Sequence, residues 1–318
     1  MKKLGSLVLS VILFFAWSVA PVHAERPLTI IVPFSAGSGT DVTAREFAQA
    51  LSEVLQQPVV IDSRVGAEGR IAAQALLNAP ADGRTLIFTS SSLSVLEPLM
   101  KKDLPYDPVR DFAPVCGVAR MPLVLSVPAS STYATAAEVV AAAKAKPGKL
   151  TFAHSSASLR LAGELFNQSA GVSMTDVPYK STVTALTDLV GNQVDMMHID
   201  ISGGLPFFQS GRLKPLLVTG SRRVQSIPDV PSAQEAGIPG YSMSPWFGIF
   251  VSSKAAPAAV EQMRRSVQQA LGSPHISASL TMRGLEPFAS CGEELRQIQQ
   301  DEIAQYRKVL STAGIEPQ

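Results

Sequence analysis

The stretch LTIIVPFSAGSGTDVTAREFAQAL, residues 28–51, contains the pattern that decides the fold. Its opening run is apolar and rich in β-branched residues, and it ends at Pro33, which is typical of a buried strand. A turn rich in glycine and serine follows. An apolar period typical of a helix begins after Thr40 and Asp41, either of which can cap a helix N-terminus. The stretch therefore predicts a strand, a tight loop and a helix.

The loop in this stretch has the properties of an anion site. Gly37 and Gly39 lack side chains, so a bound group can approach the backbone N–H donors closely. The helix that follows directs the positive end of its dipole towards the same point. This local pattern indicates an anion but leaves its identity open.

The first 24 residues have the pattern of a secretory signal peptide. A basic start at Lys2 and Lys3 is followed by an apolar run, and residues 22–24 fit a small-residue cleavage site. An uncleaved membrane anchor is the alternative, which the short run and the cleavage pattern disfavour. Cleavage after Ala24 leaves 294 residues, about two domains by length. We expect a soluble mature chain in the periplasm.

Charge and cysteine content narrow the classes of function. The signal segment holds two of the 27 basic residues and no acid, which leaves 25 basic against 26 acidic residues. This balance gives no indication of nucleic-acid or membrane-surface binding. Cys116 and Cys291 would reach an oxidising compartment, where they either pair or remain two buried thiols. Their spacing does not decide between these alternatives.

Strand-like and helix-like segments alternate along the mature chain, which predicts the α/β class. Residues 28–90 read as consecutive βαβ units with a parallel sheet, and the alternation resumes from Lys149 as a second α/β unit. Two long apolar stretches, 111–128 and 240–253, are candidates for segments that cross between the units. Residues 257–271 and 293–314 read as amphipathic helices that we expect to pack on the first domain.

The ligand of an α/β sheet lies outside the carboxyl ends of its strands. This rule gathers five predicted loops that are rich in Gly, Ser and Thr and therefore offer neutral hydrogen-bond donors. These loops are residues 35–41, 64–69, 89–92, 154–158 and 179–182. Such a lining recognises a small polar anion without a strongly basic pocket.

Enzyme motifs are largely missing. The sequence GSGTD is neither a P-loop nor a dinucleotide fingerprint. Ser90, His198 and Asp200 can form a hydrolase triad only if the fold brings them together, and no G-x-S-x-G elbow occurs. The other histidines of the mature chain, His154 and His275, occur in no metal-binding spacing, so we expect no metal site.

Several segments together resemble the Bug-type substrate-binding proteins of tripartite tricarboxylate transporters. They include PFSAGSGTDVTAR, VGAEGRIAAQAL, PADGRTL, VPYKSTVTALTDLVGNQVDMM, PDVPSAQEAGIPGY and PWFGIFVSSKAAP, in order from about Leu28 to the C-terminus. The resemblance implies a two-lobed periplasmic binding protein of type II, with two mainly parallel sheets joined by two crossing strands. Ligands of the family are small carboxylates, including dicarboxylic amino acids, di- and tricarboxylates and aromatic acids.

The resemblance and the loops together give domain boundaries, a site and partners. Domain 1 is expected to comprise residues 25–121 and 247–318, and domain 2 residues 122–246. The implied partners are a small carboxylate and the permease subunits of a tripartite tricarboxylate transporter, with no cofactor, no catalysis and a monomeric state. An exported serine hydrolase is the alternative function.

The expected ligand-binding residues are Phe34, Ser35, Ala36, Gly37, Ser38, Gly39, Thr40, Asp41, Gly66, Ala67, Glu68, Gly69, Ser90, Ser91, His154, Ser155, Ser156, Arg160, Tyr179, Lys180, Ser181 and Asp200.

The chain departs from the family pattern within these loops. Ser38 and Glu68 stand where the family usually has glycine, Arg160 where it has histidine, and Ser181 where it has glycine. Asp41 fits a helix cap better than a ligand contact, because a carboxylate facing an anion would repel it. Arg160 is either a solvated side chain or a counter-ion to a second carboxylate. The departures bear on which carboxylate is bound rather than on the fold.

Overall fold

The computed structural model describes residues 26–34, 36, 39–179, 181–220 and 222–317. The predicted signal peptide, residues 1–24, lies outside these ranges, and so do Ser35, Gly37, Ser38 and Lys180 of the predicted site. Within the described ranges, no helix combines the length and the apolar character that a membrane crossing requires.

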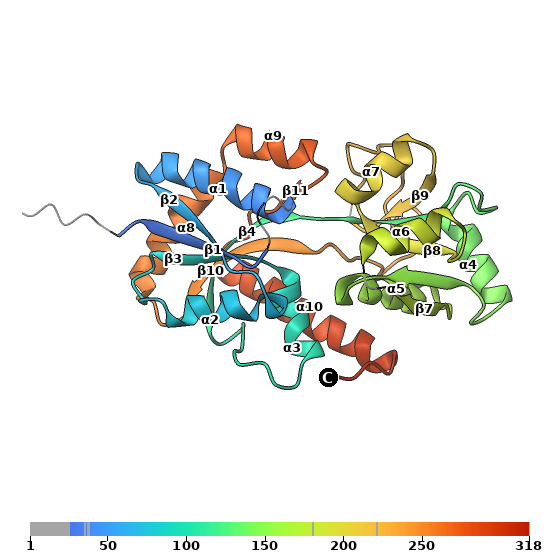
Figure 1. The fold of residues 1–318 in the computed structure, drawn as a ribbon, viewed down its shortest axis with the longest axis horizontal. Coiled ribbons are helices and arrows are strands. Elements are labelled where there is room, and N and C mark those ends of the chain that lie inside the picture. The colour runs from blue at the N-terminus through green and yellow to red at the C-terminus, as the bar shows by residue number, and fades with distance from the viewer. Residues whose placement is uncertain (1–25, 35, 37–38, 180, 221, 318) are drawn as a thin grey trace, which may run out of the picture.

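Two sheets organise the chain, and each lies in its own lobe (Figure 1). The first lobe contains a six-stranded sheet in the order β11-β4-β10-β3-β1-β2. Its strands are β1 (Leu28–Val32), β2 (Val59–Ser63), β3 (Thr85–Ser90), β4 (Phe112–Arg120), β10 (Trp246–Ser252) and β11 (Glu286–Pro287). Strands β2, β1 and β3 are parallel, which confirms the βαβ units predicted over residues 28–90.

The second lobe contains a five-stranded sheet in the order β7-β6-β8-β5-β9. Its strands are β5 (Leu123–Pro128), β6 (Thr151–His154), β7 (Thr175–Pro178), β8 (Met196–Asp200) and β9 (Leu213–Val218). Strands β7, β6 and β8 are parallel, and β5 runs antiparallel between β8 and β9. The predicted second α/β unit is therefore present.

Helices cover both sheets. Those of the first lobe are α1 (Gly39–Leu55), α2 (Arg70–Asn78), α3 (Glu97–Met100), α8 (Pro257–Leu271), α9 (Pro274–Met282) and α10 (Glu293–Thr312). Those of the second lobe are α4 (Ala136–Ala145), α5 (Ala157–Ala170), α6 (Thr182–Val190) and α7 (Ile201–Gln209). A short 3₁₀ turn, Ala67–Gly69, precedes α2, and a π-helical segment, Ser92–Leu96, precedes α3.

Side-chain alternation along β1 shows how the first sheet buries both faces. Ile30 belongs to the apolar cluster that contains Phe47 of α1, whereas Ile31 belongs to the cluster that contains Leu76 of α2. Successive side chains of a strand point to opposite faces, so a strand covered by helices on both sides needs a continuous apolar run. This explains why LTIIV contains so few polar residues.

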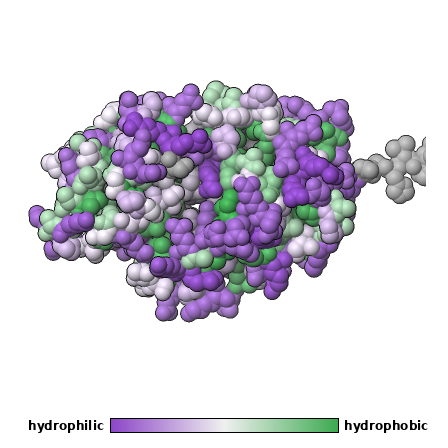
Figure 2. All heavy atoms as spheres, turned by 180° about the vertical axis from the view of Figure 1, so that it is seen from behind, coloured by the Kyte–Doolittle hydropathy of each residue, from purple (hydrophilic) through white to green (hydrophobic). Residues whose placement is uncertain are grey.

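The face shown in Figure 2 is mostly hydrophilic, and its hydrophobic residues lie in small separate patches.

Two segments cross between the lobes (Figure 1). Only Met121 and Pro122 separate β4 in the first sheet from β5 in the second. The return segment leads from β9 to β10, which enters between β3 and β4 and runs antiparallel to both. Because each crossing strand arrives from the opposite lobe, it runs against its neighbours, and both sheets are mixed. The predicted α/β class with two crossing strands is confirmed.

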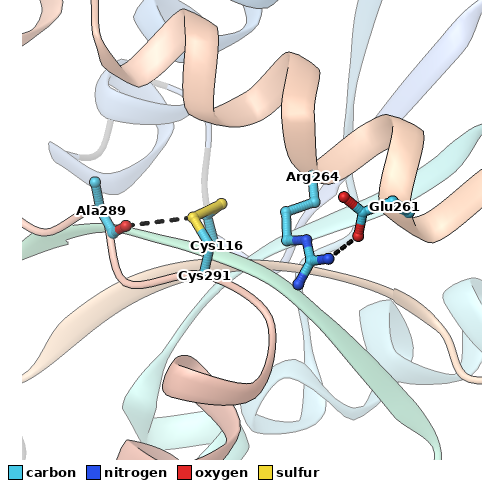
Figure 3. Close-up of a disulfide and its surroundings, with 5 residues drawn as sticks. All are labelled: Cys116, Glu261, Arg264, Ala289 and Cys291. Atoms are coloured by element: carbon cyan, nitrogen blue, oxygen red, sulfur yellow. Dashed lines mark hydrogen bonds and ion pairs between the residues drawn. A yellow bond between two sulfur atoms is a disulfide. The ribbon is translucent and has the colours of Figure 1, made fainter.

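A disulfide joins Cys116 of β4 to Cys291 in the loop before α10, near Arg264 and Glu261 of α8 (Figure 3). The backbone supports the same pairing, since the N–H of Gly117 donates to the carbonyl of Ser290 at 2.8 Å. Of the two alternatives that the sequence left open, the structure has the paired one.

Helix α10 contacts both lobes. It packs on β4 and the π-helical segment in the first lobe and on α5 in the second. There the side-chain amide of Gln168 donates to the carbonyl of Val309 at 2.8 Å. Helix α8 packs on α1 and β4, as predicted for the first domain. The residue boundaries given for the two domains stay a prediction.

Candidate binding cleft

Two adjoining cavities, of about 460 Å³ and about 220 Å³, lie where the lobes meet. They share Phe34, Ser90 and Ser92 from the first lobe and Ser156 and Ser158 from the second. A wall built from both lobes is the arrangement expected for a ligand held between two domains. We call the two cavities together the cleft.

The cleft has a mixed lining of hydroxyl groups and hydrocarbon, with two carboxylate residues, Glu97 and Asp200. The larger cavity is completed by Pro33, Val65, Gly66, Gly69, Leu93, Glu97, Ser155 and Ala157. The smaller is completed by Thr40, Met121, Leu123, Leu159, Thr182, Asp200, Pro245 and Phe247. Among the described residues, neither lining includes a lysine or an arginine. Its hydrogen-bond donors there are neutral, as the sequence predicted for these loops.

The loop before α2 reaches the cleft through backbone that only glycine adopts easily. Gly66 has φ of 130° and Gly69 has φ of 93°, and a Cβ on Gly69 would lie 2.4 Å from Cδ1 of Leu93. Both glycines line the larger cavity. Ala67, between them, is exposed and lines neither cavity. The loop thus brings its main chain, rather than a side chain, to the wall of the cleft.

The described part of the first loop is divided between cleft and helix. Phe34 and Thr40 line the cleft, Gly39 begins α1, and Ala36 is exposed outside both linings. Asp41 is buried in the first turn of α1 and pairs with Nε of Arg45 at 2.8 Å. This position agrees with the expected role of Asp41 in organising the helix start.

The end of β3 contributes one of its two predicted serines. Ser90 lines both cavities. Ser91 is buried, and its hydroxyl accepts a hydrogen bond of 3.2 Å from the backbone N–H of Trp246. Ser91 therefore fixes the start of β10 and lies outside the lining.

Second-lobe residues line the cleft mainly from helix starts. Ser156 caps α5, its hydroxyl accepting from the N–H of Leu159 at 3.3 Å, and Asp200 caps α7, accepting from Gly203 at 2.8 Å. Ser155 lines the larger cavity and shares a 2.8 Å hydrogen bond with Thr182. Ser181 caps α6, where its hydroxyl accepts from Thr184, and lines neither cavity.

Three other predicted residues of the second lobe form contacts outside the lining. The Nε2 atom of His154 lies 3.3 Å from a carboxylate oxygen of Asp176, and Nε of Arg160 lies 3.1 Å from the same oxygen. Burial lowers the pKa of His154, although Asp176 acts in the opposite direction. Tyr179 donates to Asp188 at 2.9 Å. All three side chains therefore have a polar contact within the second lobe.

The ion pair of Arg160 leads to a prediction. Because Arg160 is paired with Asp176 and lies outside the lining, Arg160→Ala is expected to change carboxylate affinity by less than about twofold. Titration calorimetry measures this. Arg223→Ala, which breaks a more exposed pair with Glu235, is the control. A large loss of affinity confined to Arg160→Ala would show instead that the guanidinium reaches the ligand.

The structure adds a contact that the predicted set of site residues lacks. The hydroxyls of Ser92 and Ser158 lie 2.9 Å apart and join the two lobes across the cleft. Both serines fall within the loops predicted to face the ligand, residues 89–92 and 154–158. Their pairing depends on how the lobes meet, and no local pattern signals it.

The conceivable hydrolase triad is not assembled. His198 is fully buried in β8, and its Nε2 atom lies 2.6 Å from the hydroxyl of Tyr241. Burial lowers the pKa of His198 to about 3. Ser90 and Asp200 line the cleft, while His198 is absent from both linings.

In the described part of the chain, no cluster of His, Cys, Asp or Glu could hold a metal ion.

The fold and the cleft define a two-lobed α/β protein of the binding-protein type, with its candidate site between the lobes. The family model described as tripartite tricarboxylate transporter family receptor matches residues 43–315, and the chain belongs to this family. This confirms the resemblance found in the sequence.

The similarity of this chain to individual proteins agrees with the family assignment. Protein BugT of Bordetella pertussis is 32% identical over 314 residues, covering 96% of each chain. A solved structure described as R. palustris Rpa4515 with adipate is 34% identical, with a TM-score of 0.78 over 93% of this chain and 99% of that one. MatC from Rhodopseudomonas palustris with bound malate is 30% identical, with a TM-score of 0.72 over 90% and 99%.

Proposed function

We propose that this chain is a periplasmic receptor that binds a small carboxylate between its lobes and delivers it to the membrane subunits of a tripartite tricarboxylate transporter. Its membership of the receptor family supports the transport role. Two similar structures contain adipate and malate, which are both small dicarboxylates. The neutral donors and hydrocarbon in the cleft suit the charged end and the carbon skeleton of such a ligand.

The observation that carries the proposal is that four helices begin at the cleft with neutral residues. Residues at the starts of α1, α2, α5 and α6 line its cavities, namely Thr40, Gly69, Ser156 and Thr182, whereas α7 begins there with the capping carboxylate of Asp200. A helix N-terminus presents unpaired backbone N–H groups and a partial positive charge. Several of them around one cavity favour an anion without a basic side chain.

In this proposal the first loop, residues 35–40, and the second, residues 66–69, hold one carboxylate through backbone amides and ordered water. Residues 154–158 and the segment around Thr182, in the second lobe, then contact the rest of the ligand.

The proposal also includes cleavage after Ala24, a monomeric mature chain, and binding without catalysis or cofactor. A mature mass beginning at Glu25 in periplasmic extract tests the cleavage.

A thermal-shift screen of small carboxylates tests the proposed binding. A ligand that binds the folded chain alone raises its apparent stability by mass action, by about 2.7 kcal/mol at a hundredfold excess over Kd. We expect one or more acids to raise the melting temperature and to be recovered chemically unchanged. Conversion of the recovered acid or of an ester analogue would support the hydrolase instead.

A further inference from the structure

A buried cluster lies where the two crossing segments leave the first sheet. Arg120 ends β4 and Trp246 begins β10, and the two residues are direct partners in the antiparallel ladder. Both contact one residue of α10. The indole N–H of Trp246 donates to Oε2 of Glu302 at 2.8 Å, and Nη1 of Arg120 lies 3.8 Å from Oε1. Glu302 therefore links both crossings to a third element.

The cluster is largely enclosed. The side chain of Glu302 is 14% exposed and that of Arg120 is 28% exposed, and Trp246 is fully buried. The guanidinium of Arg120 lies over the ring of Phe288, 4.0 Å from its centre. Burial of the Glu302 carboxylate costs hydration, which its two partners replace only in part.

Helix α10 is also the element that spans the lobes. Beyond Glu302 it packs on α5 of the second lobe (Figure 1). There the side chain of Gln168 donates to the carbonyl of Val309. Any rotation of the second lobe about the crossing segments has to change their orientation relative to α10 or the packing of α10 on α5. Hinges are a few residues at the ends of elements, and Arg120 and Trp246 occupy such positions.

We propose that Glu302 is a positioning residue that fastens both crossing segments to α10 and so holds the lobes in the arrangement in which Ser92 meets Ser158. Ionisation of Glu302 weakens the fastening, because the enclosed carboxylate loses hydration that its two partners replace only in part, whereas the protonated carboxyl still accepts from Trp246. The relative position of the lobes should consequently depend on pH.

The pH range follows from the surroundings of Glu302. Burial raises the pKa of Glu302 to about 7, although the hydrogen bond from Trp246 and the charge of Arg120 act in the opposite direction. Tyr306, one turn further along α10, has a pKa raised by burial and by Glu302 and stays neutral. Glu286 of β11 pairs with Arg120 in the ladder, and burial raises its pKa too. Because the pKa of Glu302 is raised above its ordinary value, this arrangement binds the proton more tightly than one in which water reaches the carboxyl, so the fastening should be strongest below about pH 7 and weaken above it.

A distance measurement between the lobes tests the proposal without any ligand, so its outcome is independent of whether a carboxylate binds. Spin labels at Val183→Cys in the second lobe and Met282→Cys in the first use two highly exposed positions. Their distance distribution is measured in the full mature chain from about pH 8 to about pH 5.5. We expect it to be narrow at low pH and to broaden and shift as the pH rises through about 7.

In Glu302→Gln the pH-dependent shift is expected to be lost, because glutamine still accepts from Trp246 but carries no charge to titrate. Arg120→Gln removes the charge that favours ionised Glu302, should move the shift to higher pH, and serves if Glu302→Gln folds poorly. Glu261→Gln, which breaks a pair with Arg264 within α8, should retain it. No shift in the parent, or the same shift in Glu302→Gln as in the parent, overturns the proposal.

Discussion

A Gly69→Val variant is expected to bind carboxylates roughly a hundredfold more weakly than the parent chain, a loss of about 3 kcal/mol. Gly69 has φ of 93° and lines the larger cavity, and a Cβ there would lie 2.4 Å from Cδ1 of Leu93. A β-branched residue in this conformation is strained by about 1–3 kcal/mol. The loop must therefore move, and its amides leave the position proposed to hold the carboxylate.

Gly171→Val is the matched control for this variant. Gly171 ends α5 with φ of 62°, a Cβ added there would meet no atom within 4 Å, and the residue lines neither cavity. The substitution imposes comparable backbone strain away from the cleft. We expect Gly171→Val to lower the melting temperature while its Kd stays close to that of the parent. Equal affinity losses in both variants would show that strain in general, rather than the loop before α2, weakens binding.

A Cys291→Ser variant is expected to lower the free energy of unfolding by about 2–5 kcal/mol. The disulfide joins residues 175 positions apart, so it restricts the unfolded chain over more than half its length. It also attaches the segment before α10 to β4 beside two backbone hydrogen bonds, Gly117 to Ser290 and Gly292 to Val115. Denaturant unfolding monitored by circular dichroism measures the loss.

Reductant provides the internal control for the disulfide. The parent chain should approach the stability of Cys291→Ser when a thiol count confirms reduction, while the variant should be insensitive to reductant. Carboxylate affinity should be unchanged wherever the variant is folded, because neither cysteine lines the cleft. A parent chain whose unfolding midpoint is the same before and after complete reduction would contradict the stabilising role.

The parts of the fold that follow from local patterns were predictable from the sequence. Residues 28–51 give a strand and a helix because the apolar period changes from continuous to helical within a few residues. Helix α9, Pro274–Met282, was missed because its apolar residues form no clear stripe. The antiparallel direction of β5 and β10 was also missed, since strand order depends on contacts distant in sequence.

The candidate site was predictable at the level of loops and less so at the level of side chains. Ser90, Ser155 and Ser156 line the cleft because they follow strands whose carboxyl ends meet there. Arg160 pairs with Asp176 of β7, a partner that only the three-dimensional arrangement supplies. The contact between Ser92 and Ser158 and the hydrocarbon walls of Met121 and Phe247 depend on how the lobes meet.

Isothermal titration calorimetry of the mature chain with adipate, malate and a wider set of small carboxylates tests the central claim most directly. The claim predicts that at least one acid binds with a stoichiometry of one per chain and that Gly69→Val, but not Gly171→Val, abolishes or greatly weakens the heat signal. Absence of binding by every carboxylate in the set, in a chain shown to be folded, would contradict it.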